Sequence, residues 1–173
     1  MNIFYLDHDP SLAAQMHCDK HVVKMILETA QIMSTVARAK CALNHIETPS
    51  DLYQPTHVNH PSVLWAGESW SNYCWVYLLG CNLGNEYNLR YGKEHKSMII
   101  IWQAWKTVTI SDFELHRPTT IRQCMPEQYQ IIGDPVGAYR SYYIGEKTRM
   151  FNWKVRGQPD WVTACNDTAP GAQ

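Results

Sequence analysis

The chain lacks the sequence signals of several common functional classes. Its 173 residues contain no Gly-rich phosphate loop, no G-x-S-x-G segment and no internal repeat. This absence removes the usual signs of P-loop enzymes, α/β-hydrolases and solenoid proteins. No apolar run approaches the length of a membrane span, and the N-terminus lacks the basic region and long apolar run of a signal peptide. We therefore expect a cytoplasmic protein that has no membrane partner.

Paired cysteines and an excess of basic residues are missing as well. The six cysteines form no C-x-x-C pair and no zinc-type spacing, which favours reduced thiols in the core. The net charge is −1 with His neutral, so the overall basic excess typical of proteins that grip duplex DNA is absent. A nearly neutral chain can still carry a local basic patch.

The chain is rich in apolar and aromatic residues. Hydrophobic residues make up 45% of it, and 7 Trp and 10 Tyr stand against only 3 Phe. A chain of this length is expected to form one domain with a substantial core. We predict a single domain over residues 1–163 and a disordered small polar tail over residues 164–173.

Helical periodicity predicts an all-α fold, a compact domain around two long central helices with a short extended N-terminal arm at residues 2–6. The first long helix is predicted over residues 9–39, because Asp9 is a good N-cap and Pro10 suits the first helical position. The second is predicted over residues 61–91 and begins with Pro61. Further helices are expected over residues 94–107 and 135–154.

The first predicted helix carries a narrow polar stripe on an otherwise mostly apolar surface. At about 100° per residue the stripe is roughly 80° wide. Such a stripe on a central helix faces either solvent or a cleft, and side chains suited to proton transfer and nucleophilic attack favour a cleft. We predict a cleft between the two long helices. The stripe consists of His17, His21, Lys24, Glu28, Gln31 and Thr35, and its first four residues are the predicted catalytic groups.

A second polar cluster stands where the second long helix begins. The free amides and the positive dipole of a helix start favour an anion, and His57, Asn59 and His60 would add donors there. Near the end of the chain, Tyr143 and Lys147 share a helix face at four-residue spacing.

Three segments together resemble a known family. They are NIFYLDHDPSLAAQMHCDKHVVKMILETAQIMST at the start, then THVNHPSVLW, then DPVGAYRSYYIGEK. In this run and order the chain is similar to a phage-associated family grouped with the pyrimidine-dimer DNA glycosylases. The resemblance implies an all-helical fold, N-glycosylase chemistry on damaged or modified pyrimidines, and subsequent strand cleavage in the host-cell cytoplasm.

The best-known branch of that superfamily uses an N-terminal α-amine that attacks the sugar carbon, together with a Glu on the first long helix. The resemblance therefore implies the Met1 amine or Lys24 as the nucleophile, with Glu28 handling protons and His17 or His21 assisting. It also implies a substrate-binding set that holds an unstacked base and contacts phosphate. That set is His57, Asn59, His60, Trp65, Asn72, Tyr143 and Lys147.

Two other functions fit the same residues. His17 and His21 have the i,i+4 spacing of two metal ligands, and His57 or His60 with Glu28 could complete the site of a metal-dependent hydrolase of a nucleotide. A protein that binds or sequesters a free nucleotide would use the same helix start and aromatic residues. We expect no resident cofactor if the protein is a glycosylase, and a divalent ion at His17 and His21 if it is a metal-dependent hydrolase. DNA or a free nucleotide is the expected partner, and the oligomeric state is left open.

Overall fold

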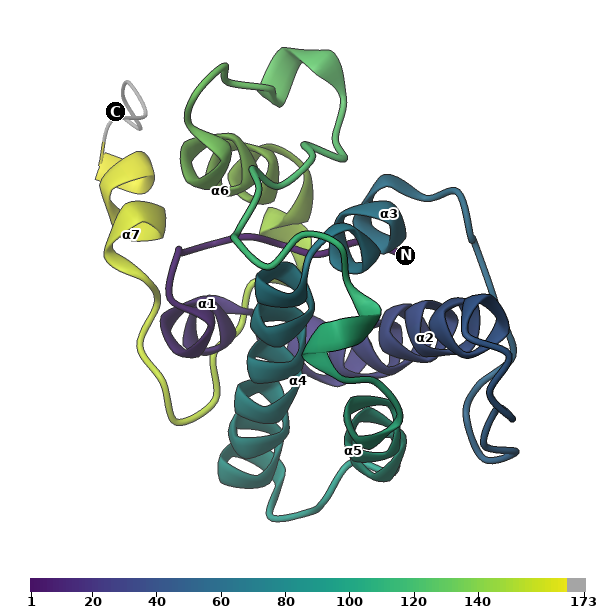
Figure 1. Cartoon of the computed structure of the whole chain (residues 1–173). Coiled ribbons are helices and arrows are strands. Elements are labelled where there is room, and N and C mark those ends of the chain that lie inside the picture. The colour runs from purple at the N-terminus through teal and green to yellow at the C-terminus, as the bar shows by residue number, and fades with distance from the viewer. Residues whose placement is uncertain (168–173) are drawn as a thin grey trace.

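The computed structural model describes residues 1–167, and this part of the chain folds into helices without a strand (Figure 1). The structure is 60% helical, which confirms the predicted all-α class. The predicted arm at residues 2–6 is extended. The helices are α1 (Pro10–Met16), α2 (Asp19–Leu43), α3 (Pro61–Glu68), α4 (Trp70–Tyr91), α5 (Met98–Thr107), α6 (Pro135–Lys147) and α7 (Asp160–Asp167).

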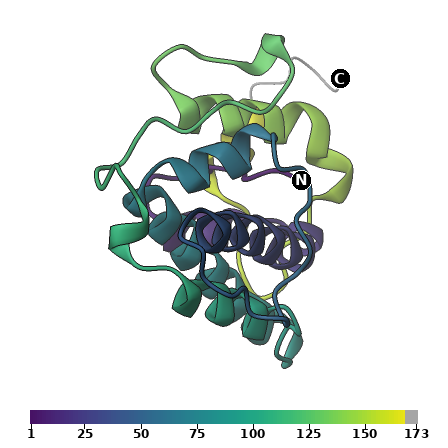
Figure 2. The ribbon, with the colours of Figure 1, turned by 45° about the vertical axis from the view of Figure 1, so that its right-hand side comes forward.

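The two long helices α2 and α4 form the centre of the fold, as predicted. α2 packs against α3, α4 and α5, and Figure 2 shows it surrounded by the other helices. Gly80 of α4 permits this close approach. A Cβ at Gly80 would lie 2.8 Å from Thr29 Cγ2 and 3.0 Å from Ile101 Cδ1. Side chains of α2 and α5 therefore occupy the space that a larger residue on α4 would need.

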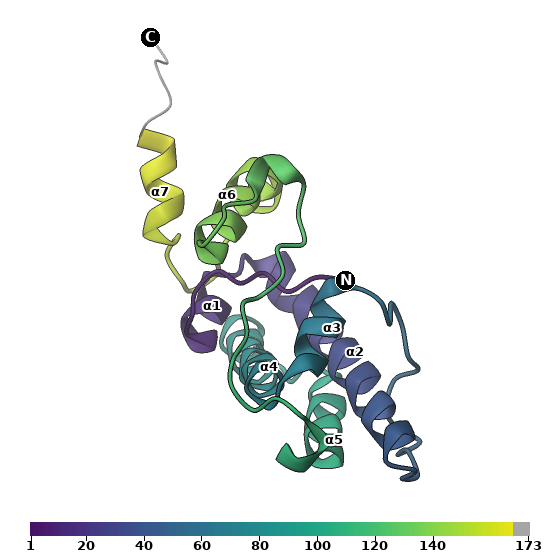
Figure 3. The ribbon, with the colours of Figure 1, turned by 45° about the horizontal axis from the view of Figure 1, so that its top comes forward.

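The N-terminal arm runs between α6 and the α1–α4 layer (Figures 1 and 3). Phe4 joins the two sides, because its ring lies 4.6 Å from that of His21 on α2 and 5.2 Å from that of Tyr143 on α6. The guanidinium of Arg140 on α6 donates to the Leu6 carbonyl oxygen at 2.8 Å and pairs with Asp7 at 3.1 Å. The arm is thus held on both faces, and this fixes the position of Met1.

The first predicted long helix is divided in two, which corrects the prediction of one helix over residues 9–39. His17 and Cys18 are extended, and α2 starts afresh at Asp19. At the break, tertiary hydrogen bonds replace the intrahelical hydrogen bonds that the backbone N–H groups would otherwise make. Cys18 N–H donates to the Tyr143 hydroxyl at 3.0 Å, and Asp19 N–H donates to the Asn152 carbonyl at 2.8 Å.

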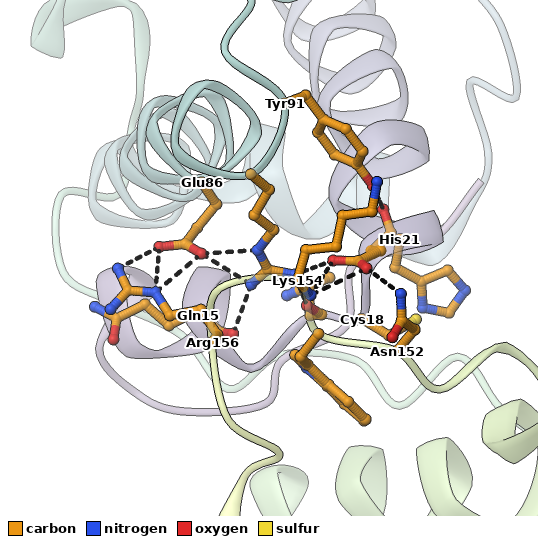
Figure 4. Close-up of polar contacts among 12 residues, drawn as sticks. Gln15, Cys18, His21, Glu86, Tyr91, Asn152, Lys154 and Arg156 are labelled. Atoms are coloured by element: carbon orange, nitrogen blue, oxygen red, sulfur yellow. Dashed lines mark hydrogen bonds and ion pairs between the residues drawn. The ribbon is translucent and has the colours of Figure 1, made fainter.

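A buried charge cluster fixes this break against α4 (Figure 4). Arg90, whose side chain is fully buried, donates to Glu86 at 2.8 Å and to Asp19 at 3.1 Å. It also donates to the carbonyl oxygens of Gln15 and His17, at 3.0 and 2.8 Å. Arg90 therefore satisfies acceptors that the interrupted helix leaves free.

The second predicted long helix is also divided, at Ser69. Its hydroxyl caps α4 by accepting from Asn72 N–H at 3.1 Å, and Trp70 N–H donates to the Leu115 carbonyl at 2.9 Å. Elsewhere α5 begins at Met98 rather than residue 94, and α6 ends at Lys147 rather than residue 154. The predicted tail begins at residue 164, yet α7 continues to Asp167, and residues 168–173 of that prediction lie outside the described residues.

Candidate active site

One cavity brings together half of the groups that the resemblance singles out, namely the Met1 amine, His21, Lys24, Glu28, His60 and Lys147. Its volume is about 590 Å³, and its walls come from the arm, the first half of α2, the start of α3 and the end of α6. The predicted cleft between the two long helices is thus displaced, because α4 contributes none of the lining residues. The lining residues are Met1, Asn2, Phe4, Lys20, His21, Lys24, Glu28, His60, Cys124, Tyr142, Lys147, Arg149 and Met150.

Glu28 is the acidic centre of this cavity. Its side chain is only 9% exposed, and Oε2 accepts the Asn2 backbone N–H at 2.8 Å. The Met1 α-amino nitrogen lies 3.9 Å from the same oxygen. Lys24, one helical turn away, places Nζ 3.3 Å from Oε1 and keeps 65% of its side chain exposed. Two primary amines therefore share one nearly buried carboxylate.

The amine of Met1 is positioned by the residue that follows it. Asn2 Nδ2 donates to the Cys124 carbonyl oxygen at 3.1 Å, and Asn2 Oδ1 accepts the Ile3 N–H at 2.8 Å. Ile3 is itself buried in the core. These contacts hold the start of the arm over the N-terminal half of α2, so that the amine faces Glu28.

His21 forms an inner wall of the cavity. Its ring stacks on Phe4, and Nδ1 lies 2.7 Å from the Tyr143 hydroxyl oxygen. Burial lowers the pKa of His21 to about 3, and the positive charges of Lys147 and Lys24 act in the same direction. The imidazole is therefore neutral at pH 7.

His60 lies at the junction of α3 with the cavity. It is the N-cap of α3, where Nδ1 accepts the Ser62 N–H at 3.1 Å. Burial lowers its pKa, the nearby N-terminal amine lowers it further, and Glu28 opposes the shift. The other two members of the predicted cluster, His57 and Asn59, are exposed and do not line the cavity. Of the three residues, only His60 reaches the site.

The cavity is more basic than the chain as a whole. Its lining contains four Lys or Arg side chains and one carboxylate, although the net charge of the chain is −1. Lys147 from α6 lies across the cavity from α2 and has Nζ 4.7 Å from the Tyr142 ring centroid. Such a patch favours an anionic ligand. The remaining three cations are Lys20, Lys24 and Arg149.

Besides His57 and Asn59, four predicted site residues lie outside the cavity wall, and these four are buried and have structural contacts. His17 is fully buried at the α1–α2 break, with Nδ1 2.6 Å from the Ala13 carbonyl oxygen. Trp65 is a core residue that donates to the Thr119 carbonyl oxygen at 3.1 Å. Asn72 is buried and uses its amide on Trp65 and Thr119. The buried Tyr143 does not line the cavity and contacts two residues that do, His21 and Phe4.

Several lining residues were not predicted. Arg149 and Lys20 belong to neither of the two polar clusters predicted from the sequence. Phe4, Tyr142 and Cys124 carried no pattern that distinguished them from core residues. The one available signal was the resemblance, which drew attention to the N-terminus and hence to the arm.

His17 and His21, the two predicted metal ligands, lie on opposite sides of the break between α1 and α2, so they do not share one continuous helix. The Nδ1 atom of each ring already has a protein partner. Within residues 1–167 no group of three or more His, Cys, Asp or Glu side chains could hold a metal ion. Across the same residues, no helix has both the length and the apolar character needed to span a membrane.

Comparisons with protein-family models, with curated proteins and with solved structures found no match to this chain.

Proposed function

We propose that this protein is a DNA N-glycosylase with an associated lyase step, acting on damaged or modified pyrimidines. One observation carries the proposal. The primary amines of Met1 and Lys24 lie 3.9 and 3.3 Å from the carboxylate oxygens of Glu28 within one basic cavity. Imine formation at a sugar carbon requires an amine and a neighbouring group that can take up and return the protons of that amine. A carboxylate next to the amine can do this.

In the proposed reaction the neutral amine nitrogen attacks C1′ of the damaged nucleotide. The new N–C1′ bond forms as the glycosidic bond breaks, and the base leaves with the bonding electron pair and takes up a proton. Glu28 accepts a proton from the attacking nitrogen and returns it to O4′, which opens the sugar ring and gives the iminium ion. Removal of a C2′ proton then expels the 3′ phosphate, and water hydrolyses the imine.

The charge of the cavity supports a polyanionic substrate. Lys20, Lys147 and Arg149 come from both sides of the opening, where they can contact the phosphates on either side of the damaged nucleotide. Such contacts position the strand and carry no sequence information. Recognition of the base would then depend on the inner wall.

Borohydride trapping tests the proposal directly. The protein, with its N-terminal residue verified by mass spectrometry, is incubated with oligonucleotides that contain an abasic site or a modified pyrimidine, with borohydride present. We expect a covalent adduct, and peptide mapping should place it on Met1 or Lys24. Glu28→Gln should lower the rate of adduct formation by about 10²–10⁴-fold. Glu94→Gln, at an exposed position away from the cavity, is the matched control.

Absence of an adduct with every oligonucleotide would overturn the imine mechanism. Titration with free nucleotides then distinguishes between the remaining candidate functions. Saturable binding of a nucleotide by the unmodified protein, weakened by Lys147→Met, would identify a nucleotide-binding protein that uses the same cavity.

A further inference from the structure

A short chain of buried contacts lies behind His21. Cys18 N–H donates to the Tyr143 hydroxyl oxygen at 3.0 Å. The same oxygen lies 2.7 Å from His21 Nδ1 and 3.4 Å from Cys18 Sγ. Tyr143 is fully buried, and burial raises its pKa well above the ordinary value. The phenol therefore keeps its proton and has one hydrogen to donate.

The direction of that donation follows from the available acceptors. The backbone N–H of Cys18 can only donate, so it occupies one lone pair of the Tyr143 oxygen. The Tyr143 proton can then point to the imidazole nitrogen of His21 or to the sulfur of Cys18. Thiol sulfur is a weak acceptor, and the nitrogen is also much closer. The proton therefore points to Nδ1, which must be unprotonated.

This assignment decides which nitrogen of His21 faces the ligand. The ring is neutral, because burial lowers its pKa to about 3, with Lys147, Lys24 and His17 adding to the shift. A neutral ring without a proton on Nδ1 has one on Nε2. Nε2 of His21 has no hydrogen-bond partner in residues 1–167 and is not enclosed like Nε2 of His17. Because His21 lines the cavity, this N–H is directed to a bound ligand.

We propose that Tyr143 is a positioning residue that fixes His21 as the Nε2–H tautomer, so that His21 donates a hydrogen bond to a carbonyl oxygen of the departing pyrimidine. The assignment of that acceptor rests on the proposed glycosylase function. Phe4 stacks on His21 and on Tyr142, with ring centroids 4.6 and 6.2 Å apart, and all three residues line the cavity, so the wall beside His21 is aromatic. Negative charge develops on the carbonyl oxygens of the base as the glycosidic bond breaks, and a fixed donor stabilises that charge.

The role differs from that of a general base. A general base must present a lone pair to the substrate, whereas this tautomer presents a proton. His21 would keep its donor over the whole range from pH 5 to pH 8. Proton transfer is then left to Glu28 and the amines, while His21 interacts with the leaving group.

The tautomer can be measured on the protein alone, without DNA. A long-range ¹H–¹⁵N correlation spectrum separates protonated from unprotonated imidazole nitrogens. We expect the neutral Nε2–H tautomer of His21 from pH 5 to pH 8. An Nδ1–H tautomer in the unmodified protein would overturn the proposal, because the ring would then donate to Tyr143 and turn a lone pair to the cavity.

Tyr143→Phe tests the positioning role. Without the phenol proton, Nδ1 loses its donor, so we expect a mixture of the two neutral tautomers of His21. Tyr142→Phe is the matched control, because Tyr142 also lines the cavity but its hydroxyl makes no contact with His21 among the described residues. An unchanged tautomer in a folded Tyr143→Phe variant would reduce Tyr143 to a packing residue and contradict the proposal.

The donor role is tested by base release from an oligonucleotide with a modified pyrimidine. His21→Leu should lower the rate on the order of 100-fold, whereas His21→Gln retains an N–H and should keep most of the activity. Equal rates for His21→Leu and the unmodified protein would overturn the donor role. An inactive unmodified protein with the expected tautomer would instead refute the glycosylase function and the proposed acceptor, and leave the Tyr143–His21 contact established.

Discussion

Acidification should destabilise the protein through His21, and the size of the effect follows from its burial. The folded state holds the pKa of His21 at about 3, whereas a His in an unfolded chain titrates near 6.5. The unfolded state therefore binds more protons as the pH falls below about 6.5, and the free energy of unfolding decreases. Between pH 7.5 and pH 5.0 this linkage lowers the free energy of unfolding by about 2 kcal/mol for His21.

The measurement compares urea unfolding, followed by Trp fluorescence, at the two pH values for the unmodified protein and for His21→Phe. Phe can stack on Phe4 as His21 does. The free-energy cost of the substitution itself cancels, because the free energy of unfolding of each variant at pH 5.0 is compared with that of the same variant at pH 7.5. We expect the decrease between pH 7.5 and pH 5.0 to be about 2 kcal/mol smaller in His21→Phe. The exposed His45 provides the control variant His45→Asn, which should keep the full decrease. A decrease of the same size in His21→Phe and the unmodified protein would show that His21 is not held neutral.

Two further substitutions test the fold around the site. Arg90→Met should lower the free energy of unfolding by about 3–5 kcal/mol, because it leaves Asp19 and Glu86 buried without their shared partner. Arg122→Met, which removes a half-exposed pair with a 3.8 Å separation, should cost less than about 1 kcal/mol in the same urea titration. Gly80→Ala should cost about 1–3 kcal/mol, because its Cβ would lie 2.8 Å from Thr29 Cγ2; no measurable loss relative to Gly157→Ala would contradict the close packing of α4.

The starts of α1, α3 and α6 were readable from the sequence because their signals are local. Asp9 accepts from the amides of Ser11 and Leu12 at 2.7 and 3.3 Å, and Pro10 follows it. His60 and Asp134 cap α3 and α6 in the same way, each followed by proline. In each case the capping side chain and the backbone amide that donates to it lie within three residues of one another.

The two helix breaks were not readable, because their causes lie far along the chain. Neither His17 nor Ser69 adjoins a Gly or Pro that would signal an interruption. The backbone groups freed at His17 are taken up by Arg90, which is 73 residues away. A pattern of apolar residues carries no information about which distant side chain will replace an intrahelical hydrogen bond.

The same limit explains the mixed result for the predicted site. His21, Lys24 and Glu28 follow one another on the continuous part of α2, so the helical spacing placed them correctly on the cavity wall. His17 precedes the break, so the spacing no longer applied to it. Trp65 is a core residue on α3, and a single sequence does not separate an aromatic ring that packs from one that binds.

The entry of the arm into the cavity bears on how the protein should be produced. Any extra segment placed ahead of Met1 would have to pass through the space beside Glu28, and it would convert the amine into an amide. Under the proposed mechanism, a purification handle added there would prevent adduct formation at Met1 without disturbing a single helix. The end of α7 lies away from the arm's first residue in Figures 1 and 3, so a handle placed after α7 rather than before Met1 would leave the Met1 amine unmodified.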